Sequence, residues 1–120
     1  MPELNKLKER IQKFNLDRDW DKFHNPKDVI LALVSEVGEL SECYRWLNDS
    51  EVDKVHADPE KKKKIEEELA DIMIYLIILG YKTNIDLIKV INEKLDKNNI
   101  RYSVEKIKGK HTNPIEGVKN

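Results

Sequence analysis

Two pairs of acidic residues have the type and the spacing that could support catalysis. Glu36 and Glu39 form one pair, and Glu68 and Asp71 form the other. Residues three apart project from the same face of a helix, so each pair would present two carboxylates side by side. Carboxylate oxygens suit hard divalent cations, and Mg²⁺ is held by a few carboxylates while it takes phosphate oxygens from a substrate. If the two helices pack together, the pairs predict metal-dependent chemistry on a phosphorylated substrate.

The surroundings of the two pairs favour a functional site over a chance pattern. In the stretch EEELADIMIYL, Asp71 stands among Leu69 and Ile72, in a segment that is apolar around nearly the whole circumference of a helix. We therefore expect that Asp71 does not lie on a solvated face. Gly38 stands between the two glutamates of the first pair, in the middle of a predicted helix, where a glycine costs roughly 1 kcal/mol. An acidic residue in an apolar helical segment and a glycine in the middle of a helix are both locally unfavourable, and both lie where the two helices are predicted to touch. Such exceptions are typical of functional sites.

Helices are the elements that must position the two pairs. The chain has 120 residues, of which 38% are charged, and it contains only four glycines and four prolines. This composition is typical of one mostly helical domain with its own core. Apolar residues recur at helical spacing in four segments, at about residues 3–16, 26–47, 59–81 and 84–101. We therefore predict an all-α, four-helix-bundle-like fold.

The boundaries of these helices differ in the strength of their signals. Two helices begin with a capping side chain followed by proline, Asn25 with Pro26 and Asp58 with Pro59. Residues 48–58 are polar and aperiodic, so they are predicted to form a connection. Beyond residue 102 the periodicity fades. We predict an all-α domain over residues 1–102 and an irregular C-terminal arm over residues 103–120.

Charge and hydropathy exclude two classes of partner. A formal net charge of -1 offers no overall field for binding nucleic acid or an anionic membrane. The longest apolar run, residues 72–79, is far shorter than the roughly 20 residues that cross a bilayer. The single cysteine, Cys43, cannot form an intramolecular disulfide. We expect a soluble, cytoplasmic protein that binds neither nucleic acid nor a membrane.

The predicted apolar faces are wider than one layer of four helices can cover, so we expect a homo-oligomer, either a homodimer or a dimer of dimers. This expectation leaves a non-catalytic alternative open, a helical oligomerisation module in which a Lys or Arg across the interface neutralises Asp71. A di-iron carboxylate bundle fits less well, because that design uses Glu-x-x-His motifs on core helices and none occurs here.

The acidic pairs also resemble the signature of a known family, the all-α nucleoside triphosphate pyrophosphohydrolases, which include MazG-like proteins and dCTP pyrophosphatases. That signature is ExxE, a spacer and ExxD, and here it reads EVGE, 28 residues (40 to 67) and ELAD. The resemblance covers about residues 3–102. The stretch RDWDKFHNPKDVILALVSEVGELSECYRW resembles the dCTP pyrophosphatase branch in particular, because a Trp and a His precede ExxE and a second Trp follows it.

This resemblance implies a MazG-type fold completed by oligomerisation and a specific activity. The expected reaction is hydrolysis of a nucleoside triphosphate between the α and β phosphates, which gives a nucleoside monophosphate and pyrophosphate. The expected substrate is dCTP or a modified deoxycytidine triphosphate, with dUTP and other nucleotides left open, and the expected role is cleansing of the nucleotide pool. The expected metal is Mg²⁺, with Mn²⁺ as a substitute, bound by Glu36, Glu39, Glu68 and Asp71. Glu36 is the candidate for orienting or deprotonating the attacking water.

The resemblance also implies a set of substrate-binding residues. Aromatic and imidazole side chains would enclose the base, and cationic and amide groups on the last predicted helix would contact the triphosphate. These residues are Trp20, His24, Trp46, Tyr75, Lys94, Asn98, Arg101 and Tyr102. Considered without the resemblance, the two tryptophans fit half-buried packing somewhat better than a binding role. Ordinary surface polarity explains the cations of the last helix equally well.

Overall fold

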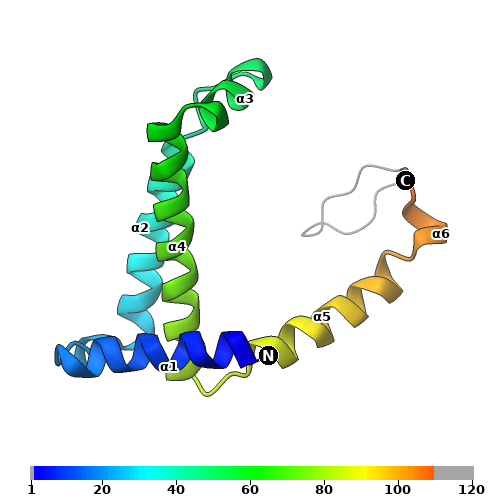
Figure 1. Ribbon diagram of the computed structural model, residues 1–120. Coiled ribbons are helices and arrows are strands. Elements are labelled where there is room, and N and C mark those ends of the chain that lie inside the picture. Colours follow the sequence, from blue (N-terminus) through cyan, green and yellow to red (C-terminus); the bar gives the residue numbers. More distant parts are fainter. Residues whose placement is uncertain (1, 110–120) are drawn as a thin grey trace. The chain divides into compact units, whose positions relative to one another are not determined.

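The computed structural model describes residues 2–109, except for the side chain of residue 107, and every regular element in that range is helical (Figure 1). The elements are α1 (Pro2–Asp17), the 3₁₀ helix η1 (Asp21–Phe23), α2 (Pro26–Glu42), α3 (Asp49–Ala57), α4 (Pro59–Lys82), α5 (Leu87–Arg101) and α6 (Val104–Ile107). The prediction of an all-α fold is confirmed.

The two predicted helix starts are present and use the predicted caps. The Asn25 side chain accepts a hydrogen bond from the Asp28 backbone N–H at 3.0 Å, and Pro26 is the first residue of α2. The Asp58 side chain accepts from the Glu60 backbone N–H at 3.0 Å, ahead of Pro59. Each cap satisfies a backbone donor that the first helical turn leaves without a partner. These starts position α2 and α4, which carry the acidic pairs.

The connection between α2 and α4 differs from the prediction. We expected one helix to run to about residue 47 and residues 48–58 to be irregular, but α2 ends at Glu42 and a further helix, α3, occupies most of the connection. The Asn48 side chain accepts from the Glu51 backbone N–H, and the Glu51 side chain accepts from the Asn48 backbone N–H. This reciprocal capping box starts α3 although its composition is polar.

Helix α4 is the common packing partner of α1, α2 and α3. It packs along α2 over its most extensive interface and also contacts α1 and α3 (Figure 1). Its C-terminal end is tied to the segment that follows α1, because Lys82 Nζ forms an ion pair with Asp21 Oδ2 at 2.9 Å and donates to the Asp21 backbone oxygen at 3.0 Å. Helix α4 therefore holds α1, α2 and α3 together.

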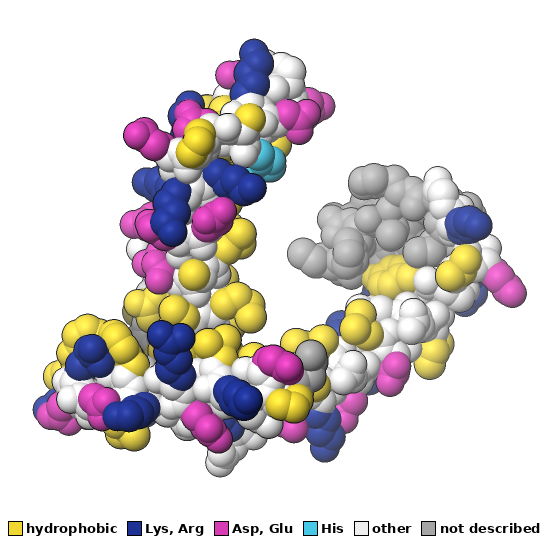
Figure 2. Space-filling model, in the orientation of Figure 1, with side chains coloured by type: hydrophobic (Ala, Val, Ile, Leu, Met, Phe, Trp, Pro, Cys, Tyr) yellow, Lys and Arg dark blue, Asp and Glu magenta, His cyan; other side chains and the backbone are white. Residues whose placement is uncertain are grey.

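The buried core of the described chain is small. Its hydrophobic members are Ile11, Val29, Val55, Ile65, Ile77 and Ile78. On α2, Val34 is 63% exposed, and on α4, Leu69 and Met73 are each 50% exposed. Figure 2 shows charged side chains over the first half of α4 and apolar side chains gathered over its second half. Within residues 1–85, several apolar side chains of α2 and α4 therefore stay exposed.

The chain divides into two compact units, residues 1–85 and 86–120. The second unit contains α5, whose first turn is capped by Asp86 accepting from the Lys89 backbone N–H at 3.1 Å. Within the segment predicted to be an irregular arm, residues 104–107 form the one-turn helix α6, and residues 110–120 lie outside the described part of the chain. Among the described residues, none of the helices combines the length and the apolarity that crossing a membrane requires.

Candidate functional site

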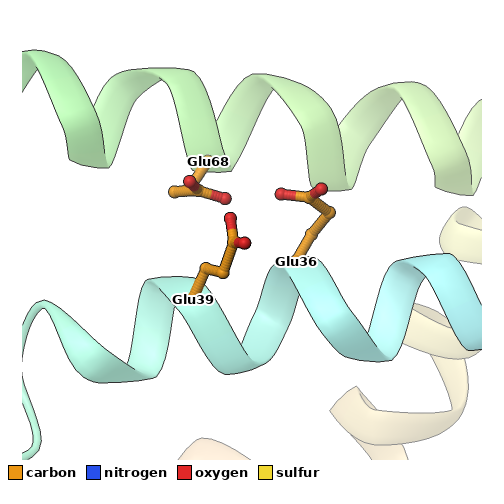
Figure 3. Close-up of side chains that lie close together, drawn as sticks. All are labelled: Glu36, Glu39 and Glu68. Atoms are coloured by element: carbon orange, nitrogen blue, oxygen red, sulfur yellow. The ribbon is translucent and has the colours of Figure 1, made fainter.

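Helices α2 and α4 bring three of the four predicted carboxylates together. One oxygen each from Glu36, Glu39 and Glu68 lies within 4.8 Å of the others. Figure 3 shows Glu36 and Glu39 extending from α2 toward Glu68 on α4. Glu68 is only 8% exposed, Glu36 is partly buried and Glu39 is exposed. We refer to these three residues as the carboxylate cluster.

Two oxygens of the carboxylate cluster, Glu36 Oε2 and Glu68 Oε2, are buried without a hydrogen-bond partner among the described residues. A hydrogen bond with Glu68, followed by repulsion from its charge, raises the pKa of Glu39 above its ordinary value. A hydrogen bond with Glu36, followed by burial, raises the pKa of Glu68. Glu39 and Glu68 are therefore harder to ionise because of their neighbours.

A divalent cation fits this arrangement. Two buried carboxylate oxygens without partners and a third carboxylate within reach supply oxygen ligands of the kind that Mg²⁺ and Mn²⁺ accept. The exposed position of Glu39 leaves one side of the carboxylate cluster open to solvent. That opening would let a bound cation keep water molecules or take ligands from a substrate.

The predicted position of Asp71 needs a correction. We expected its apolar sequence neighbours to exclude it from solvent, but Asp71 is exposed and does not belong to the carboxylate cluster. The reason is that Leu69 and Met73, which flank Asp71 in sequence, are themselves half exposed in the single chain and so do not shield its carboxylate from solvent. Close packing within this chain does not explain Gly38 either, because a Cβ at that position would meet nothing within 4 Å.

A cavity of about 560 Å³ lies next to the carboxylate cluster, and both Glu36 and Asp71 line it. This volume is within the range of pockets that bind small molecules. Its remaining wall comes mainly from aromatic and aliphatic side chains of α1, α4 and the segment after α1. These are Leu7, Ile11, Phe14, Trp20, Ile74, Tyr75 and Ile78. The cavity therefore joins an apolar wall to two carboxylates.

The turn after α1 brings Trp20 to the cavity. Asp19 has a positive φ of 55°, a conformation that Asp tolerates better than most residues, and its backbone N–H donates to the Leu16 carbonyl at 3.1 Å. The backbone N–H of Trp20 then donates to the Asn15 carbonyl at 2.9 Å. The Trp20 ring meets the Phe14 ring edge to face, with 5.7 Å between centroids. This closed turn holds an indole on the cavity wall although the side chain is 47% exposed.

Three of the four predicted base-enclosing residues line the cavity, namely Trp20, His24 and Tyr75. The Nδ1 atom of His24 is buried and has no hydrogen-bond partner among the described residues. Trp46 does not line the cavity. It lies beyond the end of α2, is 75% exposed, and has the Arg45 guanidinium carbon 4.6 Å from its ring centroid.

The predicted triphosphate contacts lie in the second unit. Lys94, Asn98 and Arg101 are on α5, and the Tyr102 backbone N–H donates to the Asn98 carbonyl at 2.8 Å. The guanidinium carbon of Arg101 lies 5.2 Å from the Tyr102 ring centroid. Their role in binding a triphosphate stays a prediction.

Sequence reasoning missed two polar residues of the cavity wall, Arg10 and Asn15. Asn15 is only 3% exposed, and its Nδ2 donates to the Tyr81 hydroxyl at 3.2 Å. A signal for it was present, since Asn15 follows Ile11 by one helical turn and so interrupts the apolar face of α1. Arg10 had no such signal, because arginine is common on the edge of an amphipathic helix.

The chain is similar to several known proteins. Residues 31–113 match the MazG-like family. The chain is 37% identical over 108 residues to dCTP pyrophosphatase 1 of Rattus norvegicus, which covers 90% of this chain and 64% of that protein. It is 38% identical over 101 residues to dCTP pyrophosphatase 1 of Homo sapiens, covering 84% of this chain and 59% of that protein. The chain thus spans less than two thirds of the length of these relatives.

A solved structure is also similar. The crystal structure of a pyrophosphatase from Archaeoglobus fulgidus superposes with a TM-score of 0.78 and 31% sequence identity. The match covers 84% of this chain and 93% of that one.

Proposed function

The chain belongs to the MazG-like family, and from this membership we propose that it is a divalent-metal-dependent nucleoside triphosphate pyrophosphohydrolase. The proposed reaction cleaves the bond between the α and β phosphates and releases a nucleoside monophosphate and pyrophosphate. The names of the rat and human relatives support dCTP, or a modified deoxycytidine triphosphate, as the substrate.

One observation carries the proposal, namely that Glu36 belongs both to the carboxylate cluster and to the cavity wall. A ligand seated in the cavity would therefore extend toward the oxygens that fit a cation. A nucleotide has this layout, with an apolar base at one end and an anionic triphosphate at the other. Stacking of a base on an aromatic side chain such as Trp20 or Tyr75 contributes roughly 1 to 3 kcal/mol.

In the proposed mechanism, Glu36, Glu39 and Glu68 hold the cation, and Asp71 lies on the cavity side within the same signature. A bound Mg²⁺ or Mn²⁺ would neutralise the negative charge on the phosphate oxygens and lower the pKa of a water molecule bound to it. Glu36 orients or deprotonates the attacking water, since it lies where the carboxylate cluster meets the cavity. The aromatic side chains hold the base and exclude water from it. Because water attacks the phosphorus directly and pyrophosphate leaves, the reaction requires no covalent intermediate.

The non-catalytic alternative is less well supported. That alternative places a Lys or Arg across an interface from Asp71, and Asp71 is exposed on a single chain, where such a partner could reach it. However, the buried oxygens without partners among the described residues belong to Glu36 and Glu68. Unpaired buried carboxylates destabilise a purely structural module, whereas a cation site requires them.

We further propose that a second copy of the chain covers the exposed apolar side chains of α2 and α4. Leu31 and Val34 on α2 are 60% and 63% exposed, and Leu69 and Met73 on α4 are each 50% exposed. Side chains of this kind rarely stay in water when they form a continuous patch. The mass in solution, measured by light scattering for the wild type and for Val34→Lys, tests the proposal. A monomeric wild type would contradict it.

The test of the proposed activity is a panel of nucleoside triphosphates incubated with Mg²⁺, with Mn²⁺ and with a chelator. Pyrophosphate release is measured separately from orthophosphate release, because cleavage between the β and γ phosphates gives only the latter. We expect pyrophosphate in the presence of metal, with dCTP among the best substrates. A folded protein that releases no pyrophosphate from any nucleotide would refute the enzymatic function.

A further inference from the structure

We propose that Asn15 reads the edge of the bound base and selects an amino group over a keto group, so that cytosine is preferred to uracil. This inference rests on the proposed function, because it assumes that the cavity holds the base of a nucleotide. It concerns a residue of α1 that lies outside the acidic signature and the aromatic residues that surround it.

Asn15 has an unused hydrogen-bond acceptor at the cavity. The side chain is 3% exposed and lines the cavity wall. Its Nδ2 donates to the Tyr81 hydroxyl at 3.2 Å, whereas none of the hydrogen bonds found in the described part of the chain uses its Oδ1. The Oδ1 atom is not among the fully enclosed side-chain atoms that lack a partner, so it is open to a hydrogen-bond donor even though most of the side chain is buried. The cavity is where such a donor can enter.

The position of Asn15 relative to Trp20 suits recognition of a planar base. The Asn15 backbone carbonyl accepts from the Trp20 backbone N–H at 2.9 Å, so the amide and the indole are held by the same turn. Both side chains line the same cavity. A base whose face stacks on the aromatic wall would present its edge to a group on an adjoining part of the wall. Asn15 is the carboxamide that lines this cavity.

The orientation of the amide decides which base it favours. With Nδ2 on Tyr81, the free Oδ1 accepts a hydrogen bond from the exocyclic amino group of cytosine. Uracil carries a keto oxygen at the corresponding position, and two acceptors would then face each other without a proton between them. The Tyr81 hydroxyl therefore acts as a positioning group, because it holds the amide in the orientation that leaves the oxygen free.

The first test measures binding of dCMP and dUMP by calorimetry without metal, for the wild type and for Asn15→Leu. Leucine has a similar size and cannot hydrogen-bond. We expect the wild type to prefer dCMP by about 10- to 100-fold, the range expected when a site built for a hydrogen bond receives a ligand that cannot form it. In Asn15→Leu the preference should fall by at least about tenfold. Gln12→Leu, on the same helix but away from the cavity, is the matched control and should keep the preference.

Tyr81→Phe gives a second test that keeps the packing of Asn15 nearly intact. Without the hydroxyl, the amide can rotate and offer Nδ2 to a keto oxygen, so binding of dUMP should improve while binding of dCMP weakens. A merely structural role for Tyr81 would weaken both ligands equally. This variant decides the question if Asn15→Leu fails to fold, which its melting temperature would reveal.

Failure of this inference differs from failure of the proposed function. Pyrophosphate release by the wild type together with an unchanged preference in Asn15→Leu, or an equal loss of both ligands in Tyr81→Phe, would overturn the role of Asn15 alone. A wild type that prefers dUMP would also overturn it. Absence of pyrophosphate release from all nucleotides would refute the activity, while monophosphate binding would still report on the base site.

Discussion

The carboxylate cluster and the cavity are adjacent but are built from different parts of the same helix. The carboxylate cluster uses Glu68, in the charged first half of α4, opposite α2. The cavity uses Ile74, Tyr75 and Ile78, in the apolar second half of α4, together with side chains of α1. The first half of α4 thus contributes to the proposed cation site, and its second half contributes to the apolar wall of the cavity.

This difference suggests a division of roles. A cation held by the carboxylate cluster would contact the phosphates, which all nucleoside triphosphates share. Changes in the carboxylate cluster should therefore affect every substrate alike. In the proposed function the cavity wall contacts the base, so changes in the wall should affect different substrates differently. Glu36 is the exception, because it belongs to both regions. Variants placed in one region and measured on both properties can test the separation.

The largest effect is expected from Glu68→Gln. Loss of this buried ligand should lower kcat/KM about 100- to 1,000-fold for every nucleotide, since a catalytic metal supplies several kcal/mol and each 1.36 kcal/mol is a factor of ten. Binding of dCMP without metal should stay within about threefold of the wild type. Pyrophosphate release and calorimetry measure the two quantities. Glu67→Gln, exposed on the same helix, is the control, and a matching loss in that variant would argue against a specific role for Glu68.

Trp20→Ala should have a smaller effect, which falls on nucleotide binding and leaves metal binding unchanged. Loss of stacking should weaken binding of dCMP about 10- to 100-fold, because each stacked base contributes roughly 1 to 3 kcal/mol. The affinity for Mg²⁺, followed by the metal-induced rise in melting temperature, should not change. Phe23→Ala is the control, since Phe23 is 61% exposed and lies off the cavity. Equal weakening of Mg²⁺ and nucleotide binding would show that the two regions are not separable.

The smallest effect concerns stability without metal. The pKa values of Glu39 and Glu68 are raised above their ordinary value of 4.5, so folding favours their protonated forms. This contribution to stability is complete below pH 4.5 and is lost as pH rises through the raised folded values. Glu68→Gln stays neutral, so its melting temperature should exceed that of the wild type by a few degrees near pH 8, with a gap that closes toward pH 4.5. Saturating Mg²⁺ should abolish this advantage. A difference in melting temperature that stays constant with pH would contradict ionisation of the carboxylate cluster as its cause.

Several features of the molecule were predictable because they depend on local chemistry. The caps at Asn25 and Asp58 follow from a side-chain acceptor ahead of a proline, and such signals need no tertiary contacts. The placement of Glu36 and Glu39 on one face follows from the helical repeat alone. The helix at 49–57 was missed because its start depends on a capping box, whereas its polar composition suggested a loop.

Features that depend on neighbouring helices were less predictable. Apolar residues around Asp71 suggested burial, but burial requires another element on that side, and the described chain places none over Leu69 and Met73. Asn15 was read as part of an amphipathic helix, and only its contact with Tyr81, 66 residues away in sequence, shows that one of its hydrogen-bonding atoms is unused.

The amino-acid sequence by itself determined the helical class, the main helix starts and the presence of paired carboxylates, because each arises from interactions within a few residues. The tertiary structure alone decided which carboxylate is buried, since Glu68 rather than Asp71 faces α2 in the carboxylate cluster. It also decided that an aromatic cavity adjoins those carboxylates. The physical reason is that burial and proximity between segments depend on how helices pack, and periodicity along one helix does not specify its neighbour.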